Sequence, residues 1–172
     1  NQPEFKRGII ANPNCSTIQS VVPLKVLYDA FGLKRVAYTT YQAVSGSGVK
    51  GKRDLAEGAN GKAPEAYPHP IYNNVLPHID VFLEDGYTKE EQKMIDETRK
   101  ILNDKDLKVT ATCVRVPVQD SHSIEIDVTL DKEATVQEIK DLFDKDERVV
   151  LVDNPEKNEY PQALNSTGRD EV

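Results

Sequence analysis

Cys15 stands where a helix is expected to begin. It follows the turn-forming segment Asn12-Pro13-Asn14 and precedes a run of apolar residues with helical spacing. A thiol at a helix start lies near free backbone N–H groups and the positive end of the helix dipole, and both favour the thiolate. The same N–H groups can stabilise an oxyanion on a substrate carbonyl. The position therefore suggests a nucleophile, and the alternative is an ordinary small buried cysteine.

His122 and Arg115 are expected on the two limbs of one turn between strands. A histidine can act as base and acid near neutral pH. An arginine can hold a carboxylate with two parallel hydrogen bonds. Such a pair suits a substrate that carries both a reacting carbonyl and a carboxylate. The alternative is a solvated turn histidine and a solvated strand-end arginine.

Glu90 and Lys93 lie three residues apart in the first turns of a predicted helix, so they share one face of it. They could bind charged groups of a ligand, or they could form an ordinary surface ion pair. Cys113 alternates in register with Val109 and Ala111. We therefore expect Cys113 in the core and not in a reactive site.

The first half of the chain predicts a helix, a strand and a long loop. The helix ends at Gly32, which is a good C-terminal stop, and Pro23 is expected to kink it. Its apolar residues recur at steps of three and four, at Ile18, Val21, Val22, Val26, Leu27 and Phe31. Residues 33–42 are rich in β-branched and aromatic side chains, which is typical of a strand.

Residues 43–77 are rich in Gly, Ser, Pro and Asn and predict a long loop, with a short helix near Arg53–Glu57. A connection of this length is usually functional or contacts a partner. Gly46-Ser47-Gly48 is interpreted as the start of this loop and not as a nucleotide-binding fingerprint. We therefore expect no nucleotide-binding domain in this chain.

The second half predicts two capped helices and three strands. Thr88 to Glu91 is a capping box for a helix that reaches about Leu102, and Thr135 to Glu138 is a second one. The buried stripe of the last helix is expected to be Val136, Ile139, Leu142 and Phe143. Between the helices, two strands that end at Arg115 and Leu130 are expected to pair as a hairpin, and Val149–Val152 is expected to be a last short strand. The pattern predicts an α+β domain over 1–172.

Bulk composition excludes several classes of function. The 172 residues carry a net charge of −7, which argues against a nucleic-acid-binding surface. No run of about 18 apolar residues is present, and the segment 1–7 lacks a signal-peptide core. Two cysteines form no disulfide framework. We therefore expect a cytoplasmic protein that contacts no membrane, and we expect no metal site.

Four segments in order resemble the motifs of the aspartate-semialdehyde dehydrogenase family, and together they extend over nearly the whole chain. The first resembles the family's nucleophile motif and the second its other signature. The segments are Gly8-Ile9-Ile10-Ala11-Asn12-Pro13-Asn14-Cys15-Ser16-Thr17, Tyr41-Gln42-Ala43-Val44-Ser45-Gly46-Ser47-Gly48, Asn74-Val75-Leu76-Pro77-His78-Ile79-Asp80 and Cys113-Val114-Arg115-Val116-Pro117-Val118.

The resemblance implies a role for each candidate residue. Cys15 would be the nucleophile and His122 the acid–base. Gln42 would orient the intermediate, and Asn14 would help to line the oxyanion site. The implied contacts with the substrate are Arg115 to the carboxylate, Glu90 to the amino group and Lys93 to the phosphate.

The implied activity is the NADP-dependent reductive dephosphorylation of aspartyl phosphate to aspartate semialdehyde through a Cys15 thioester. This oxidoreductase chemistry serves lysine, threonine and methionine biosynthesis. The implied fold is a mixed, mostly antiparallel sheet with helices on one face, like the C-terminal domain of glyceraldehyde-3-phosphate dehydrogenase. The implied assembly is a homodimer.

The family's N-terminal NADP-binding domain has no counterpart here, so the chain alone is expected not to turn over, and no cofactor-binding residue is assigned. Activity of the isolated 172-residue chain would refute this expectation. Two alternatives stay open. The chain could serve only as a dimerisation module, or it could belong to a related N-acetyl-glutamyl-phosphate reductase.

Overall fold

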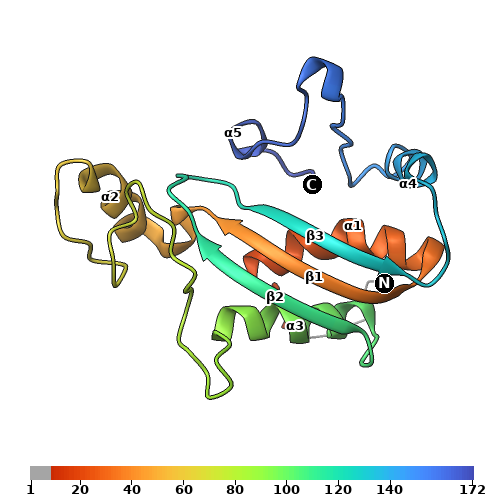
Figure 1. The fold of residues 1–172 in the computed structure, drawn as a ribbon, viewed down its shortest axis with the longest axis horizontal. Helices are drawn as coiled ribbons and strands as arrows, with labels where there is room; N and C mark the ends of the chain where they lie inside the picture. The colour runs from red at the N-terminus through yellow and green to blue at the C-terminus, as the bar shows by residue number, and fades with distance from the viewer. Residues whose placement is uncertain (1–8) are drawn as a thin grey trace.

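A three-stranded mixed sheet forms the centre of the chain (Figure 1). The computed structural model describes residues 9–172; the segment 1–7 and Gly8 of the first motif lie outside the described residues. Strand β1 (Leu33–Gln42) is central, with β2 (Lys108–Arg115) on one side and β3 (Ser123–Leu130) on the other. β1 runs parallel to β2 and antiparallel to β3. The α+β class and the mixed sheet are confirmed, although antiparallel pairs hold no majority among these strands.

The predicted hairpin is wrong, because β2 and β3 flank β1 instead of pairing with each other. The segment that joins them passes the end of β1. There the Val44 N–H donates to the Val118 carbonyl at 2.8 Å, and the Ser45 N–H donates to the Gln119 carbonyl at 3.1 Å. The chain thus crosses over β1 before β3 begins. Alternation predicted the faces of both strands correctly, but alternation does not determine which strand pairs with which.

Helix α1 (Cys15–Phe31) confirms the predicted first helix. Pro23 lies inside it without ending it, and the apolar residue most deeply buried is Leu24, at 1% exposure. Gly32 caps the C-terminal end with a φ of 71°, and its N–H donates to the Tyr28 carbonyl. A Cβ at Gly32 would lie 2.5 Å from the Asp131 carboxylate, so this turn requires glycine.

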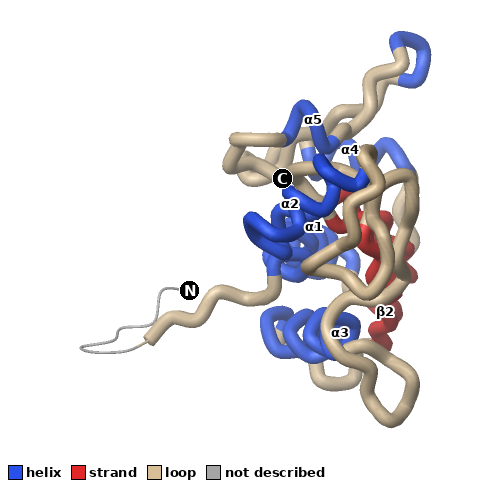
Figure 2. The backbone as a smooth tube through the Cα atoms, turned by 90° about the vertical axis from the view of Figure 1, so that its left-hand side faces the viewer, coloured by secondary structure: helices blue, strands red, loops and turns tan. Residues whose placement is uncertain are grey.

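Two helices cover one face of the sheet (Figure 2). They are α1 and α3 (Lys89–Leu102), and they pack against each other and against the strands. The main core lies between them and the sheet and includes Leu24, Val36, Tyr38, Met94 and Cys113. The opposite face of the strands carries mostly exposed polar side chains, including Arg35, Thr112, Glu125 and Asp127.

The loop region holds more helix than expected. A 3-10 turn, η1 (Val44–Ser47), leads into α2 (Gly48–Gly58), which lies beyond the end of β1 (Figure 1). A second small core of Val44, Ile71 and Leu76 joins this region to the rest. Asp54 fixes the segment that follows α2 against this helix, because its carboxylate accepts hydrogen bonds from the backbone N–H groups of Glu65 and Ala66.

The second half confirms both capped helices. Thr88 and Glu91 form the capping box of α3, and Thr135 and Glu138 form that of α4 (Val136–Phe143). Val136 is 72% exposed, so its place in the buried stripe is wrong, whereas the other three stripe residues pack against the core.

No strand forms at 149–152. The Val150 N–H donates to the Val172 carbonyl, but no ladder develops. Short turns follow instead at η2 (Pro155–Lys157) and α5 (Ala163–Ser166). Within residues 9–172, no helix has both the length and the apolar character needed to cross a membrane.

Candidate active site

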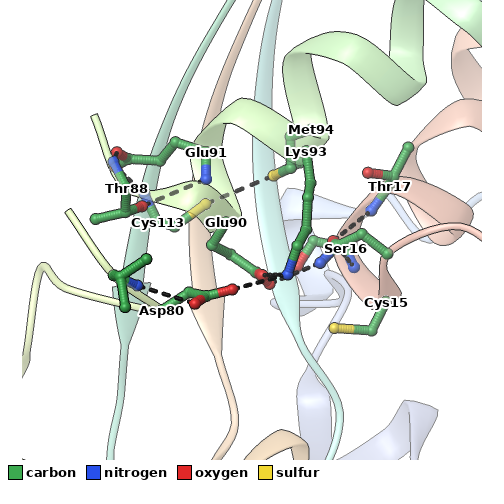
Figure 3. Close-up of polar contacts among 12 residues, drawn as sticks. Cys15, Ser16, Thr17, Asp80, Thr88, Glu90, Glu91, Lys93, Met94 and Cys113 are labelled. Atoms are coloured by element: carbon green, nitrogen blue, oxygen red, sulfur yellow. Dashed lines mark hydrogen bonds and ion pairs between the residues drawn. The ribbon is translucent and has the colours of Figure 1, made fainter. Parts of the chain in front are cut away.

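Asn14 caps α1 and so positions Cys15, the first residue of the helix. Its Oδ1 accepts from the Ser16 N–H at 2.8 Å and from the Thr17 N–H at 3.2 Å. Figure 3 shows Cys15, Ser16 and Thr17 beside Glu90 and Lys93 of α3. The cap therefore occupies the Thr17 N–H and shares the Ser16 N–H with the thiol, so these N–H groups are not free as predicted.

Cys15 lies beside His122, with 3.3 Å between Sγ and Nε2. The other ring nitrogen, Nδ1, accepts from the Ala43 backbone N–H at 2.9 Å. The two residues come from the start of α1 and from the residue before β3, 107 positions apart in sequence. The fold therefore makes a thiol–imidazole pair from two residues that were singled out separately.

The expectation of a lowered pKa for Cys15 is wrong for this arrangement. Desolvation by surrounding protein atoms and the negative charge of Glu90 raise the pKa of the Cys15 thiol, although its side chain reaches the surface. The Ser16 backbone N–H and the Arg115 charge act in the opposite direction but are weaker. Burial, and then the Arg115 charge, lower the pKa of His122 to about 4. The resting pair at neutral pH is therefore a thiol beside a neutral imidazole.

Arg115, at the end of β2, is held by two neighbours. Its Nη1 donates to the Ala43 carbonyl at 2.7 Å, and the guanidinium lies 5.9 Å from the centre of the Tyr67 ring. A Cβ at Gly46 would lie 3.2 Å from Nη1 and 3.6 Å from His122 Cε1, so Gly46 leaves room between the arginine and the histidine. Nε of Arg115 is buried with no partner among the described residues. A ligand carboxylate would satisfy it.

Glu90 links the remaining candidates. Its Oε1 accepts from Asn14 Nδ2 at 2.7 Å and from Gln42 Nε2 at 3.4 Å, and its Oε2 lies 3.5 Å from Lys93 Nζ. The carboxylate is buried, with only 6% of the residue exposed. The start of α1, the end of β1 and the start of α3 therefore meet at the buried Glu90 carboxylate. Its negative charge is paired with Lys93 and hydrogen-bonded, as a buried charge must be.

Lys93 has a second partner in Asp80, whose Oδ2 lies 2.9 Å from Nζ (Figure 3). Asp80 adopts a φ of 68°, a left-handed conformation that aspartate tolerates better than most residues. Hydrogen bonding to Asp80 raises the pKa of Lys93, and the same contact lowers the pKa of Asp80. Lys93 is thus fully charged at neutral pH and reaches the edge of the site.

All seven predicted site residues belong to one connected cluster. Asn14, Gln42 and Lys93 meet at Glu90, while His122 contacts Cys15 and shares Ala43 with Arg115.

Sequence reasoning missed the supporting residues around this cluster. Glu97 accepts from the Asn14 N–H at 2.7 Å, and its position about two helical turns after Glu90, on the same face of the helix, was a usable signal. Asp80 is the last residue of the third segment that resembles the family, Asn74 to Asp80. The backbone role of Ala43 left no signal in the sequence.

Cys113 is fully buried, and its Sγ lies 3.6 Å from Met94 Sδ (Figure 3). Burial raises the pKa of its thiol to about 12. The prediction of a core cysteine is therefore confirmed. Cys113 provides an unreactive internal control for Cys15.

A pocket of about 840 Å³ opens on the His122 side of α1. Its lining includes Ser45, Ser121 and Arg169, but not Cys15 or Arg115. The cluster described above therefore lies at the edge of this pocket and not inside it. Among residues 9–172, no three His, Cys, Asp or Glu side chains gather to hold a metal ion.

The glycine spacing at the start of α2 requires a correction. Gly46, Gly48 and Gly51 do follow the G-x-G-x-x-G spacing, after a strand and at the start of a helix. However, a Cβ at Gly51 would lie 2.6 Å from both the Val44 carbonyl and the Tyr67 hydroxyl, so this glycine lets α2 pack against η1. α2 packs mainly against η1, whereas the helix of a dinucleotide-binding unit packs against its sheet. These residues do not fit a dinucleotide.

The family model described as "Semialdehyde dehydrogenase, dimerisation domain" matches residues 24–172. The chain belongs to this family. Among the relatives of this semialdehyde dehydrogenase domain, the aspartate-semialdehyde dehydrogenase of Aquifex aeolicus is 52% identical over an alignment of 174 positions, and the alignment covers 97% of this chain and 51% of the relative. The enzyme of Bacillus subtilis is 42% identical over 96% of this chain and 52% of the relative. The chain thus spans about half the length of the curated relatives it matches.

Solved structures agree with the semialdehyde dehydrogenase assignment. Aspartate semialdehyde dehydrogenase II from Vibrio cholerae, complexed with ASA, superposes with a TM-score of 0.86 and 39% identity over 93% of this chain and 48% of that chain. The Candida albicans enzyme with NADP superposes with a TM-score of 0.66 and 27% identity over 92% of this chain and 44% of that chain. The family resemblance seen in the sequence motifs is confirmed.

Proposed function

We propose that this chain is the catalytic and dimerisation half of an aspartate-semialdehyde dehydrogenase. The observation that carries the proposal is the Cys15–His122 pair, 3.3 Å apart, inside a cluster that offers an arginine, a buried carboxylate and a lysine to one ligand. A substrate with a carboxylate, an ammonium group and an acyl phosphate has three charged groups that match these side chains. Aspartyl phosphate carries all three.

In the first step, Cys15 Sγ attacks the acyl carbon of aspartyl phosphate. A C–S bond forms, the C–O bond to phosphate breaks, and phosphate leaves with the bonding electrons. Lys93 stabilises the departing phosphate, and Arg115 and Glu90 hold the α-carboxylate and the α-ammonium group. Gln42 Oε1 is buried with no partner among the described residues, which suits a group that orients the bound intermediate.

The oxyanion that forms during attack needs hydrogen-bond donors. Asn14 Nδ2 has two hydrogens, and only one of them points to Glu90. We assign the second to the oxyanion, with the Nε2–H of His122 as a further donor. Substrate binding also changes the nucleophile, because an ammonium group at Glu90 offsets the negative charge that raises the pKa of Cys15.

The second step reduces the thioester to the aldehyde. We propose NADP as the hydride source, supported by the Candida albicans relative solved with NADP. The cofactor would be bound by the part of the protein outside this chain, since the glycines of α2 do not form a cradle for it. The residues of this chain keep the thioester positioned and supply hydrogen bonds to its oxygen.

A homodimer is part of the same proposal. The sheet face opposite α1 and α3 is polar and uncovered by the described residues, and the nearby loop exposes Val75, Val81 and Phe82. The description of the family model, a dimerisation domain, supports the proposal of a homodimer. Sedimentation as a function of concentration tests this point without any activity measurement. A cytoplasmic location is proposed because the nucleophilic thiol must stay reduced.

The test of the proposed activity uses a chimera in which this chain replaces the corresponding half of the Aquifex aeolicus relative. We expect phosphate-dependent reduction of NADP with aspartate semialdehyde, and a loss of about 10³-fold or more in Cys15→Ser. Cys113→Ala is the matched control and keeps the activity. A Cys15→Ser chimera that keeps its rate overturns the proposal, and so does preference for N-acetyl-glutamate semialdehyde. An inactive but folded chimera that still dimerises supports the dimerisation-only alternative.

A further inference from the structure

Arg115 has few partners for a buried arginine. The residue is only 6% exposed, yet among residues 9–172 its single hydrogen bond is the one from Nη1 to the Ala43 carbonyl at 2.7 Å. Nε is buried and has no partner among these residues. A guanidinium carries five N–H donors in one plane, at the end of a side chain with several rotatable bonds. One hydrogen bond at one corner leaves the direction of this plane undetermined, so another contact must fix it.

Tyr67 supplies a second contact of a different kind. The guanidinium carbon of Arg115 lies over the face of the Tyr67 ring, 5.9 Å from its centre, which is within the range of a cation–π interaction. This contact engages none of the N–H donors. The ring and the Ala43 carbonyl together therefore restrain the guanidinium and leave the donor on Nε free for a ligand.

The position of Tyr67 is itself determined by three contacts. The Asp54 carboxylate accepts from the Glu65 and Ala66 N–H groups at 2.9 and 2.7 Å, which fixes the chain directly before Tyr67. A Cβ at Gly51 would lie 2.6 Å from the Tyr67 hydroxyl, so this glycine of α2 leaves room for the end of the ring. The ring also packs against the second small core. Residues of α2 thus hold the aromatic ring beside Arg115.

We propose that Tyr67 is a positioning residue, whose ring holds the Arg115 guanidinium in the direction that binds the substrate's α-carboxylate. This inference rests on the proposed function, since the carboxylate is that of the proposed substrate. The Tyr67 hydroxyl is buried without a partner among the described residues, so the role belongs to the ring and not to the hydroxyl. The helical segment within the predicted long loop then has a function, which is to support this ring.

The first test measures carboxylate binding beside Cys15 without turnover. Arg115 lies across the space beside Gly46 from His122, which contacts Cys15, so a carboxylate on Arg115 is near Sγ. The chimera is alkylated at Cys15 with iodoacetate, which carries a carboxylate, and with neutral iodoacetamide. We expect Tyr67→Leu to lower the ratio of the two rates by about 3- to 10-fold, because the guanidinium loses its restraint.

Tyr67→Phe is the matched control, because it keeps the ring and removes only the hydroxyl. We expect it to leave the ratio unchanged. Tyr67→Met fills space with a flexible apolar side chain but has no ring face, and it should lower the ratio as Tyr67→Leu does. It also provides a second ring-free variant if Tyr67→Leu does not fold. A merely structural role would change the rates of both reagents alike, and an unchanged ratio in the ring-free variants overturns the proposal. So does an equal fall in Tyr67→Phe.

A double substitution shows whether Tyr67 acts through Arg115. In an Arg115→Met background the guanidinium is absent, so Tyr67→Leu should change the ratio by less than about 2-fold, since coupled residues are not additive. A full further fall in that background means that the ring affects the carboxylate by another route, which contradicts the proposal.

Steady-state kinetics of the active chimera give a second readout. Tyr67→Leu should raise KM for aspartate semialdehyde by about 3- to 10-fold and change kcat by less than about 2-fold, as expected for the loss of uniform binding. A lower kcat at an unchanged KM contradicts the positioning role. An inactive chimera would refute the proposed activity and leave the alkylation ratios readable. Unchanged ratios would remove the role of Tyr67 and leave the proposed activity standing.

Discussion

Replacing Asn14 should weaken both the start of α1 and the buried charge beneath it. The side chain accepts from two backbone N–H groups and donates to the buried Glu90 carboxylate at 2.7 Å. Losing a cap costs about 1 kcal/mol of stability, and losing a hydrogen bond to a charged group costs about 1.5–3 kcal/mol. Asn14→Ala should therefore lower the free energy of unfolding by about 2.5–4 kcal/mol.

Asn14→Ser separates the two contributions. Serine caps as well as asparagine does but is too short to take over the bond to Glu90. We expect Asn14→Ser to cost only about 1.5–3 kcal/mol, so that alanine is worse than serine by about 1 kcal/mol. Urea unfolding of the three chains measures this difference. Equal stabilities of the Ala and Ser variants would refute the capping role, and an Asn14→Ser chain as stable as the original would refute the contribution of the Glu90 contact.

Three further predictions concern the cluster. Folding lowers the pKa of His122 to about 4, so the stability that the neutral ring contributes is complete above pH 6.5 and is lost as the pH falls towards 4. Urea unfolding should show that the free energy of unfolding falls on the order of 2–3 kcal/mol over this range, and His122→Gln should not show this fall. In the chimera, Arg115→Lys should reduce kcat/KM by about 10- to 100-fold, since lysine cannot hold a carboxylate with two parallel bonds, whereas Arg35→Lys on the outer sheet face should not. Gly46→Ala should lower kcat/KM by at least about 10-fold, with a change in the free energy of unfolding below about 1 kcal/mol. The reason is that the added methyl group would lie 3.2 Å from Arg115 Nη1, in the gap between Arg115 and His122. An unchanged kcat/KM would contradict this position of Gly46 beside the site.

Local signals in the sequence were sufficient for the elements whose ends are determined locally. The capping boxes at Thr88 and Thr135 and the stop at Gly32 depend on residues within one turn, and the structure has all three. The hairpin failed because β1, almost a hundred residues before β3, takes the position between β2 and β3. Alternating side chains identify a buried face but not the neighbour in the sheet.

The candidate site shows the same division. Side-chain types and family motifs were enough to select Cys15, His122 and Arg115, and the fold brings them together. The direction of the pKa of Cys15 was predicted wrongly, because a helix start suggests a low value while burial and Glu90, 75 positions away, raise it. The Ala43 amide that holds His122 could not be predicted, since every residue except proline has the same backbone N–H.

Capture of the acyl group tests the central claim most directly. The chimera is mixed with aspartyl phosphate in the absence of NADPH, quenched in acid and digested, and the peptides are examined by mass spectrometry. The mechanism predicts an aspartyl thioester on the peptide that contains Cys15, none on the peptide that contains Cys113, and release of the acyl group by hydroxylamine. An acyl group on any other residue, or phosphate release without an acylated Cys15, would contradict it.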